Sequence, residues 1–140
     1  MKFINNSRHT DALLRYLTSW VLQEIDVDPK IITEIRFENM ENYPEYKHCC
    51  HVDSTWKGFA TWNPQTSKPH NGHIRIWLGK KAPPKWRVRF PFVWKRNNIR
   101  EAICEAIAHE ALHVHFRSDK HMRIYRAERF IVKRYRKKHS

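Results

Sequence analysis

Apolar positions near the start of the chain first follow the period of a helix and then, in part, the two-residue alternation of a strand. Leucine, valine and isoleucine recur at three- and four-residue intervals from Leu13 to Ile25, the spacing of one face of an amphipathic helix. Thr10 or Ser7 is placed to cap this helix, and Asp28-Pro29 should end it because the residue before a proline avoids the helical region. The stretch from Lys30 to Phe37 is rich in β-branched residues and partly alternates, so it predicts a strand.

Two short strands and a turn are predicted in the middle of the chain. Trp56 to Trp62 is a candidate strand, and His73 to Gly79 alternates cleanly between aliphatic and other side chains. Asn71-Gly72 is a hairpin turn signal, so we expect a small, mostly antiparallel sheet. A further alternating stretch, Lys85 to Lys95, contains Pro91, which cannot donate to a ladder; a strand there would lie at an edge or bulge.

Two helices are predicted in the last third of the chain. Asn98 and Glu101 have the spacing of a capping box, so a helix should begin there and run to about Phe116. A second helix, about Met122 to Lys137, leads into a basic tail. We find no internal repeat or linker, and 140 residues suffice for one core. Residues 1–140 are therefore interpreted as a single α+β domain: an N-terminal helix, the small sheet and these two helices.

The first of these two helices contains an unusual polar motif, "HEALH", at residues 109–113. Residues four apart share a helix face, so His109 and His113 can present two imidazoles to one metal ion. Glu110 lies about 100° round the helix, where its carboxylate can reach a water held by that metal but is badly placed as a ligand. This is the HExxH arrangement, in which two histidines bind Zn²⁺ and the glutamate is the general base.

A third protein ligand is expected, because a catalytic zinc usually takes three and leaves one position for water. His121 and Glu128 are both candidates, and they lie on one face of the last predicted helix together with Tyr125. Tyr125 or His73 could contact the substrate or stabilise an oxyanion.

The stretch "HEALHVHFRSDKHMRIYRAERF", residues 109–130, resembles the zincin-like metallopeptidases of the SprT-like and YgjP-like groups. Their pattern is an HExxH helix, a short loop, a third histidine and an aromatic residue one turn later. The resemblance implies a zincin-like fold, zinc-dependent peptide-bond hydrolysis with Glu110 as base, and the ligands His109, His113 and His121. The loop before His121 is longer than in the tightest family members, so Glu128 stays an alternative ligand. In zincins a peptide substrate commonly lies along an edge strand, for which residues 73–79 are the candidate.

Charge and cysteine content indicate the surroundings of the protein. Net charge is +13, from 27 Lys and Arg against 14 Asp and Glu, which favours polyanions such as DNA or RNA. Three cysteines cannot pair fully, which favours the reducing cytoplasm, and no run of about 18 apolar residues would span a membrane. Small size and basic charge suit a phage or mobile-element product. The candidate nucleic-acid-binding residues are Arg123, Arg126, Arg129, Lys133 and Arg134.

The leading interpretation is a zinc metallopeptidase that acts on a protein or peptide, including proteins associated with nucleic acid. One alternative is a metal-dependent nuclease, because three histidines on this scaffold also resemble the YbeY-like endoribonucleases. That family's motif, however, has no glutamate at the position of Glu110 and has a shorter gap to the third histidine. A second alternative is a non-catalytic nucleic-acid-binding protein whose structural zinc is saturated by four residues: His109, His113, His121 and Glu128. The sequence leaves oligomeric state open.

Overall fold

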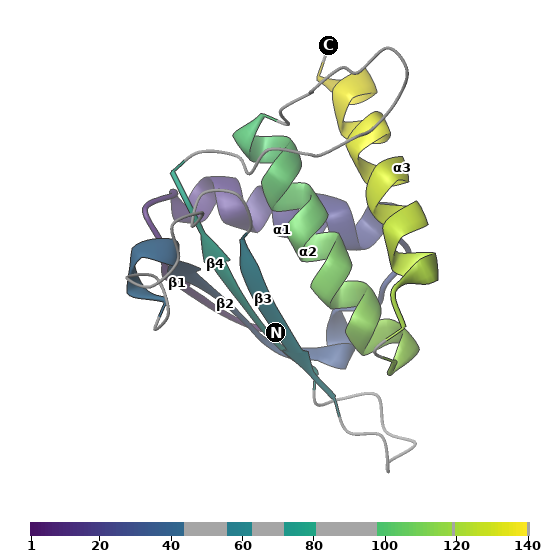
Figure 1. The fold of residues 1–140 in the computed structure, drawn as a ribbon, viewed down its shortest axis with the longest axis horizontal. Coiled ribbons are helices and arrows are strands. Elements are labelled where there is room, and N and C mark those ends of the chain that lie inside the picture. Colours follow the sequence, from purple (N-terminus) through teal and green to yellow (C-terminus); the bar gives the residue numbers. More distant parts are fainter. Residues whose placement is uncertain (44–55, 63–71, 81–97, 119, 140) are drawn as a thin grey trace.

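The computed structural model describes residues 1–43, 56–62, 72–80, 98–118 and 120–139 (Figure 1). Its elements in chain order are β1 (Lys2–Asn6), α1 (Asp11–Glu24), η1 (Pro29–Ile31), β2 (Ile32–Asn39), η2 (Met40–Asn42), β3 (Lys57–Thr61), β4 (Gly72–Leu78), α2 (Ile99–Phe116) and α3 (Met122–Lys138). The fold is α+β, with one mixed four-stranded sheet and three α-helices among these residues.

Most predicted elements are confirmed, and their ends follow the expected capping chemistry. The Thr10 side chain accepts a hydrogen bond from the backbone N–H of Leu13 at the start of α1. The Asn98 side chain accepts one from the N–H of Glu101, at 2.8 Å, at the start of α2. The predictions for residues 85–95 and for the turn at Asn71 lie outside the described residues.

The sheet differs from its prediction in strand direction. Its order is β1-β2-β4-β3; β1 and β2 are parallel, β2 and β4 are parallel, and only β3 and β4 are antiparallel. The expectation of a mostly antiparallel sheet is therefore wrong. The chain begins with a strand that was not predicted, and α1 is the crossover that lets β1 and β2 run parallel. Alternation in a sequence shows which strand face is buried, but it does not show the direction of the neighbouring strand.

The order of strands also corrects the placement of residues 73–79. All but the last of them belong to β4, which lies between β2 and β3, so β4 is not an edge strand. Among the strands that the structure describes, β1 and β3 are the outer two.

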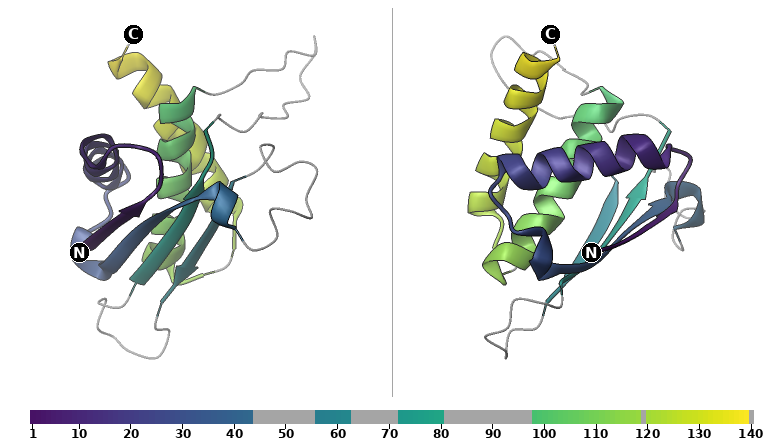
Figure 2. Two further views of the ribbon diagram at one scale, coloured as in Figure 1. Left: turned by 90° about the vertical axis from the view of Figure 1, so that its left-hand side faces the viewer. Right: turned by 180° about the vertical axis from the view of Figure 1, so that it is seen from behind.

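Helix α2 is the central element of the packing. It contacts β3 and β4 on one side and also contacts α1 and α3. Figure 2 shows the helices on one side of the sheet, with α3 running along α2 in the opposite direction. The fully buried side chains between them include Leu14, Leu17, Val21, Ile35, Phe37, Ile74, Ile76, Ile103, Ile107, Ile124 and Ile131. Among the described residues, no helix is both long and apolar enough to cross a membrane.

Candidate metal centre

Three histidines converge where α2 ends and α3 begins. His109 and His113 come from α2, and His121 directly precedes α3. One nitrogen of each ring lies within 4.8 Å of the others. Arg117 takes a left-handed conformation, with φ of 50° and ψ of 46°, and ends α2. The chain then reverses direction, which returns His121 to the rings that α2 carries.

Contacts at Nδ1 orient the imidazole rings of His109 and His113, so that each ring turns its Nε2 atom toward the other. His113 Nδ1 lies 2.7 Å from the carbonyl oxygen of Ser118, and His109 Nδ1 contacts the carboxylate of Glu128. Both partners can only accept, so each Nδ1 carries the proton and each Nε2 carries a lone pair. The two Nε2 atoms lie 3.1 Å apart. Two lone pairs this close repel each other unless a proton or a cation lies between them, so the arrangement suits a metal ion.

Glu128 is placed outside the group of metal-ligating atoms. Among the described residues, the cluster that could hold a metal consists of His109, His113 and His121. The carboxylate of Glu128 meets His109 at Nδ1, away from the nitrogen that faces His113. The geometry brings the three predicted histidines together and gives the alternative ligand a different contact.

Glu110 lies beside the histidines in a buried position. The pKa of its carboxyl is raised to about 7, chiefly by burial; the charge of His109 opposes this rise, and the charge of Glu128 adds to it. Burial by itself lowers the pKa of His109, but the hydrogen bond and charge of Glu128, with the charges of Glu110 and Glu105, raise it above its ordinary value. The site therefore holds a carboxyl group that changes its protonation near neutral pH.

Gly58 of β3 faces Glu110 and was not identified from the sequence. A Cβ atom at Gly58 would lie 2.5 Å from Oε1 of Glu110, so only glycine leaves room for the carboxylate where it stands. A glycine inside a strand is a known sign of close approach by another group. The sequence contained that sign, but not the identity of the approaching group.

Aromatic rings flank the histidines on two sides. Tyr125 stacks on His121, with ring centroids 5.4 Å apart and 17° between the planes, and is half exposed. Trp62, directly after β3, lies parallel to His113 at 6.3 Å. The predicted position of Tyr125 beside the site agrees with the structure, whereas sequence reasoning missed Trp62.

His73 is not part of the site. Gly72, two residues before Ile74 on β4, lies against Val114 of α2, so this face of the strand looks toward α2. Successive residues of a strand point to opposite faces, so His73 points to the other face. There its ring lies 4.0 Å from Glu34. The structure therefore places His73 on the face of the sheet away from the three histidines, and its predicted substrate contact stays a prediction.

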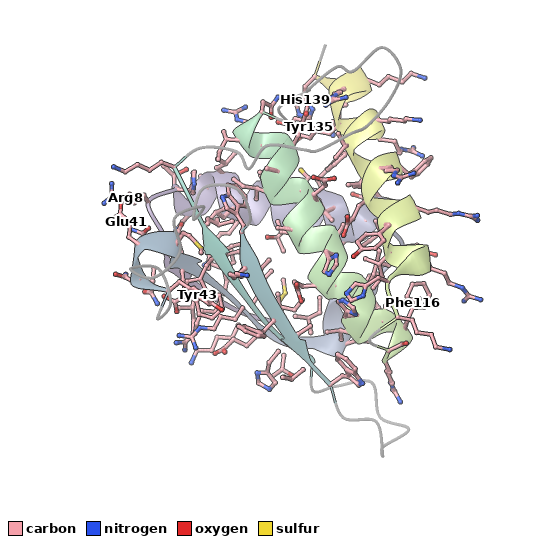
Figure 3. All side chains as sticks on the ribbon, viewed as in Figure 1. Arg8, Glu41, Tyr43, Phe116, Tyr135 and His139 are labelled. Atoms are coloured by element: carbon pink, nitrogen blue, oxygen red, sulfur yellow. The ribbon has the colours of Figure 1, made fainter. Side chains whose placement is uncertain are left out.

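The predicted basic residues of α3 are all exposed, but they are not equivalent. Arg134 forms an ion pair with Glu24 of α1 at 2.8 Å. The other four define what we call the α3 basic surface: Arg123, Arg126, Arg129 and Lys133. Figure 3 shows side chains with nitrogen ends extending outward along α3, beginning near the labelled Phe116 at the end of α2.

No protein-family model, curated protein or solved structure matches the chain.

Proposed function

We propose that the protein is a zinc-dependent metallopeptidase. The observation that carries the proposal is the convergence of His109, His113 and His121, with the buried carboxyl group of Glu110 beside them. Three imidazole nitrogens suit Zn²⁺, and three protein ligands leave a fourth position for water or substrate. Zn²⁺ bound there would act as a Lewis acid on a substrate carbonyl and lower the pKa of a water molecule.

Glu110 would serve as the general base and then as the acid. A pKa of about 7 suits this role, because a group that accepts and returns a proton works best when its pKa is near the working pH. The carboxylate would take the proton of the attacking water and pass it to the leaving amine. Because Gly58 has no side chain, the carboxylate of Glu110 has room to lie there, and its burial shields it from bulk water.

Strand β3 replaces β4 as the candidate for the substrate-binding strand. It is an outer strand among the described ones, and its Gly58 faces Glu110 of α2. A peptide that adds to an edge strand gains main-chain hydrogen bonds. A substrate along β3 would pass Trp62 next to the histidines.

The proposal is tested by separating metal binding from hydrolysis. We expect Glu110→Gln to keep bound Zn²⁺ but to lose cleavage of a fluorescent casein, and His113→Ala to lose both. Metal content of the purified proteins and the cleavage rate, with and without chelator, are the two measurements. Matched controls on the same helix are Glu105→Gln and the exposed His115→Ala, which should retain both properties. A fully active Glu110→Gln enzyme would refute the base.

A metal-dependent nuclease remains the rival activity. The same histidines would serve it, but the buried Glu110 beside them supports peptide hydrolysis. Labelled RNA and DNA added to the casein assay separate the two, since a nuclease would cleave nucleic acid in a chelator-sensitive way and leave casein intact. A saturated structural zinc is less well supported, because Glu128 contacts His109 Nδ1 and does not join the ligand atoms.

We further propose that the α3 basic surface holds DNA or RNA, so that substrates are proteins associated with nucleic acid. Its four cations lie along one side of α3, beginning within one turn of His121. No carboxylate partner is found for Arg126, Arg129 or Lys133 within the described part of the chain. Exposed cations in a row match the repeating charge of a phosphate backbone and bind it by releasing counterions.

Salt-dependent binding tests this surface. Replacing Arg126, Arg129 and Lys133 with Gln should lower the slope of log affinity against log salt by about 2.7, three phosphate contacts at about 0.9 each. The control removes the same charge from the sheet side of the molecule: Lys2, Lys57 and Lys80 to Gln. Equal losses in both variants would mean that net charge, and not this surface, attracts the nucleic acid.

A further inference from the structure

We infer that Glu128 is a positioning residue that fixes the tautomer and orientation of His109, an inference that rests on the proposed metal centre. The side chains of His109 and Glu128 are 24% and 14% exposed, so their contact is largely shielded from water. The contact joins the middle of α2 to the second turn of α3. It therefore ties one candidate ligand to the helix that begins beside another, His121.

The composition of α3 supports a specific purpose for this carboxylate. Glu128 is the one acidic residue among 17 in the helix, which also contains eight Lys and Arg residues. A surface glutamate on a helix commonly pairs with a basic residue three or four positions away. Glu128 instead meets an imidazole at the candidate metal centre. None of the residues three or four positions away from it, on either side, is basic.

The contact determines which nitrogen His109 offers. A carboxylate accepts a proton from Nδ1 and leaves the lone pair on Nε2, the nitrogen that lies 3.1 Å from Nε2 of His113. A negative partner also makes the imidazole a stronger donor to a metal ion. The Ser118 carbonyl orients His113 in the same way, but without a charge. The two candidate ligands of α2 are thus oriented alike, but one has a charged partner and the other a neutral partner.

The contact also gives Glu128 a role different from that of Glu110. Glu110 would face the reacting water, whereas Glu128 touches neither substrate nor the ligand side of His109. It would act only through the ring that it orients, as outer partners of metal-bound histidines commonly do.

Nitrogen-15 NMR of the imidazole rings in the metal-free, full-length protein tests the inference without relying on activity. At alkaline pH, where the ring is neutral, wild-type His109 should carry its proton on Nδ1. Glu128→Met keeps the volume but removes the acceptor, so His109 should change to the Nε2–H tautomer. Glu128→Gln retains a carbonyl acceptor and should keep most of the Nδ1–H form. Glu24→Met, on α1, is the control and should change nothing.

Binding of Co²⁺, followed by its visible absorption, is the second measurement. Loss of an outer partner typically weakens metal binding about 10- to 100-fold, which we expect for Glu128→Met, with a smaller loss for Glu128→Gln. A wild-type His109 protonated on Nε2 overturns the inference, and so does a Glu128→Met protein that keeps both the tautomer and the affinity. If the tautomer changes as expected but the wild type does not cleave peptides, the positioning role stands and the peptidase proposal fails.

Discussion

Helices α2 and α3 lie side by side, yet they place charged groups in opposite surroundings (Figure 1). In α2, the polar residues Glu101, Glu110 and His113 are each at most 7% exposed. In α3, most charged residues are exposed, and eight of 17 are Lys or Arg. Burial changes the protonation chemistry of a group, whereas exposure leaves it as a charge screened by water. The candidate site forms where the buried helix meets the start of the exposed one.

The largest expected contrast between the two helices is in stability. Ile107 of α2 is fully buried, whereas Phe130 of α3 is 51% exposed. Ile107→Ala should lower the free energy of unfolding by about 3–4 kcal/mol, through lost burial and a residual cavity. Phe130→Ala should change it by less than about 0.5 kcal/mol. Urea denaturation followed by circular dichroism measures both, and similar losses would contradict the burial that separates the helices.

The second prediction concerns the sheet side of α2. Gly58→Ala would place a methyl group 2.5 Å from Oε1 of Glu110, the far end of a flexible side chain, so the carboxylate should move and the fold should persist. A displacement of about 1 Å at a catalytic group can lower the rate about 100-fold. We expect such a loss in casein cleavage with metal content unchanged. Thr61→Ala, on the opposite face of the same strand, is the control. If Gly58→Ala is as active as wild type, the space at Gly58 does not matter for catalysis by Glu110.

The contrast between the helices also explains what the sequence could predict. The positions of His109, Glu110 and His113 relative to one another follow from the helical period alone. The spacing to His121 could be counted, but its return to the site depends on the left-handed Arg117. The contact of Glu128 with His109 depends on α3 running back along α2, a tertiary feature that no local pattern encodes.

The sheet was harder to predict, for related physical reasons. The two apolar residues of β1, Phe3 and Ile4, are adjacent, so the strand shows no alternation. Without β1, the parallel pair of strands that α1 connects could not be predicted. Alternation placed His73 opposite the aliphatic face of β4, but it did not show that the helix with the histidines packs against that aliphatic face. Local periodicity thus predicted the elements, and long-range packing determined their order, direction and partners.

The third prediction concerns how stability depends on pH through the buried Glu110 of α2. The pKa of Glu110 is raised to about 7, so ionising it in the folded state is unfavourable. The penalty is absent below the ordinary carboxyl pKa of about 4.5, grows between about 4.5 and 7, and is complete above that range. This ionisation should cost metal-free wild type about 2.5 kcal/mol of stability over this window, and Glu110→Gln should lack that part of the loss.

Urea denaturation with chelator at pH 5 and pH 8 measures this difference. Glu110→Gln should be the more stable protein at pH 8 and differ by less than about 1 kcal/mol at pH 5. Glu105→Gln is the control on the same helix. Equal pH dependence in wild type and Glu110→Gln would show that the carboxyl group ionises normally.

The smallest expected effect compares two arginines of α3 that differ only in the partner they meet. Arg136 forms two hydrogen bonds, at 2.9 and 3.0 Å, with the buried carboxylate of Glu101 on α2. Arg134 pairs with Glu24 of α1, whose side chain is 24% exposed. Removing Arg136 leaves a buried charge without its forked partner, although the Asn98 side chain still reaches that carboxylate. Arg136→Gln should therefore cost about 1–2 kcal/mol of unfolding free energy, and Arg134→Gln less than about 0.5 kcal/mol.

The two variants remove the same charge from the same helix, so their difference isolates the surroundings of the partner. Added salt should reduce the loss of unfolding free energy caused by Arg134→Gln and leave the loss caused by Arg136→Gln nearly unchanged. The reason is that ions screen exposed pairs more than buried ones. Urea denaturation at low and high ionic strength measures both. If the two losses are equal and equally sensitive to salt, α2 does not shield its charges, and the burial argument for Glu110 loses its basis as well.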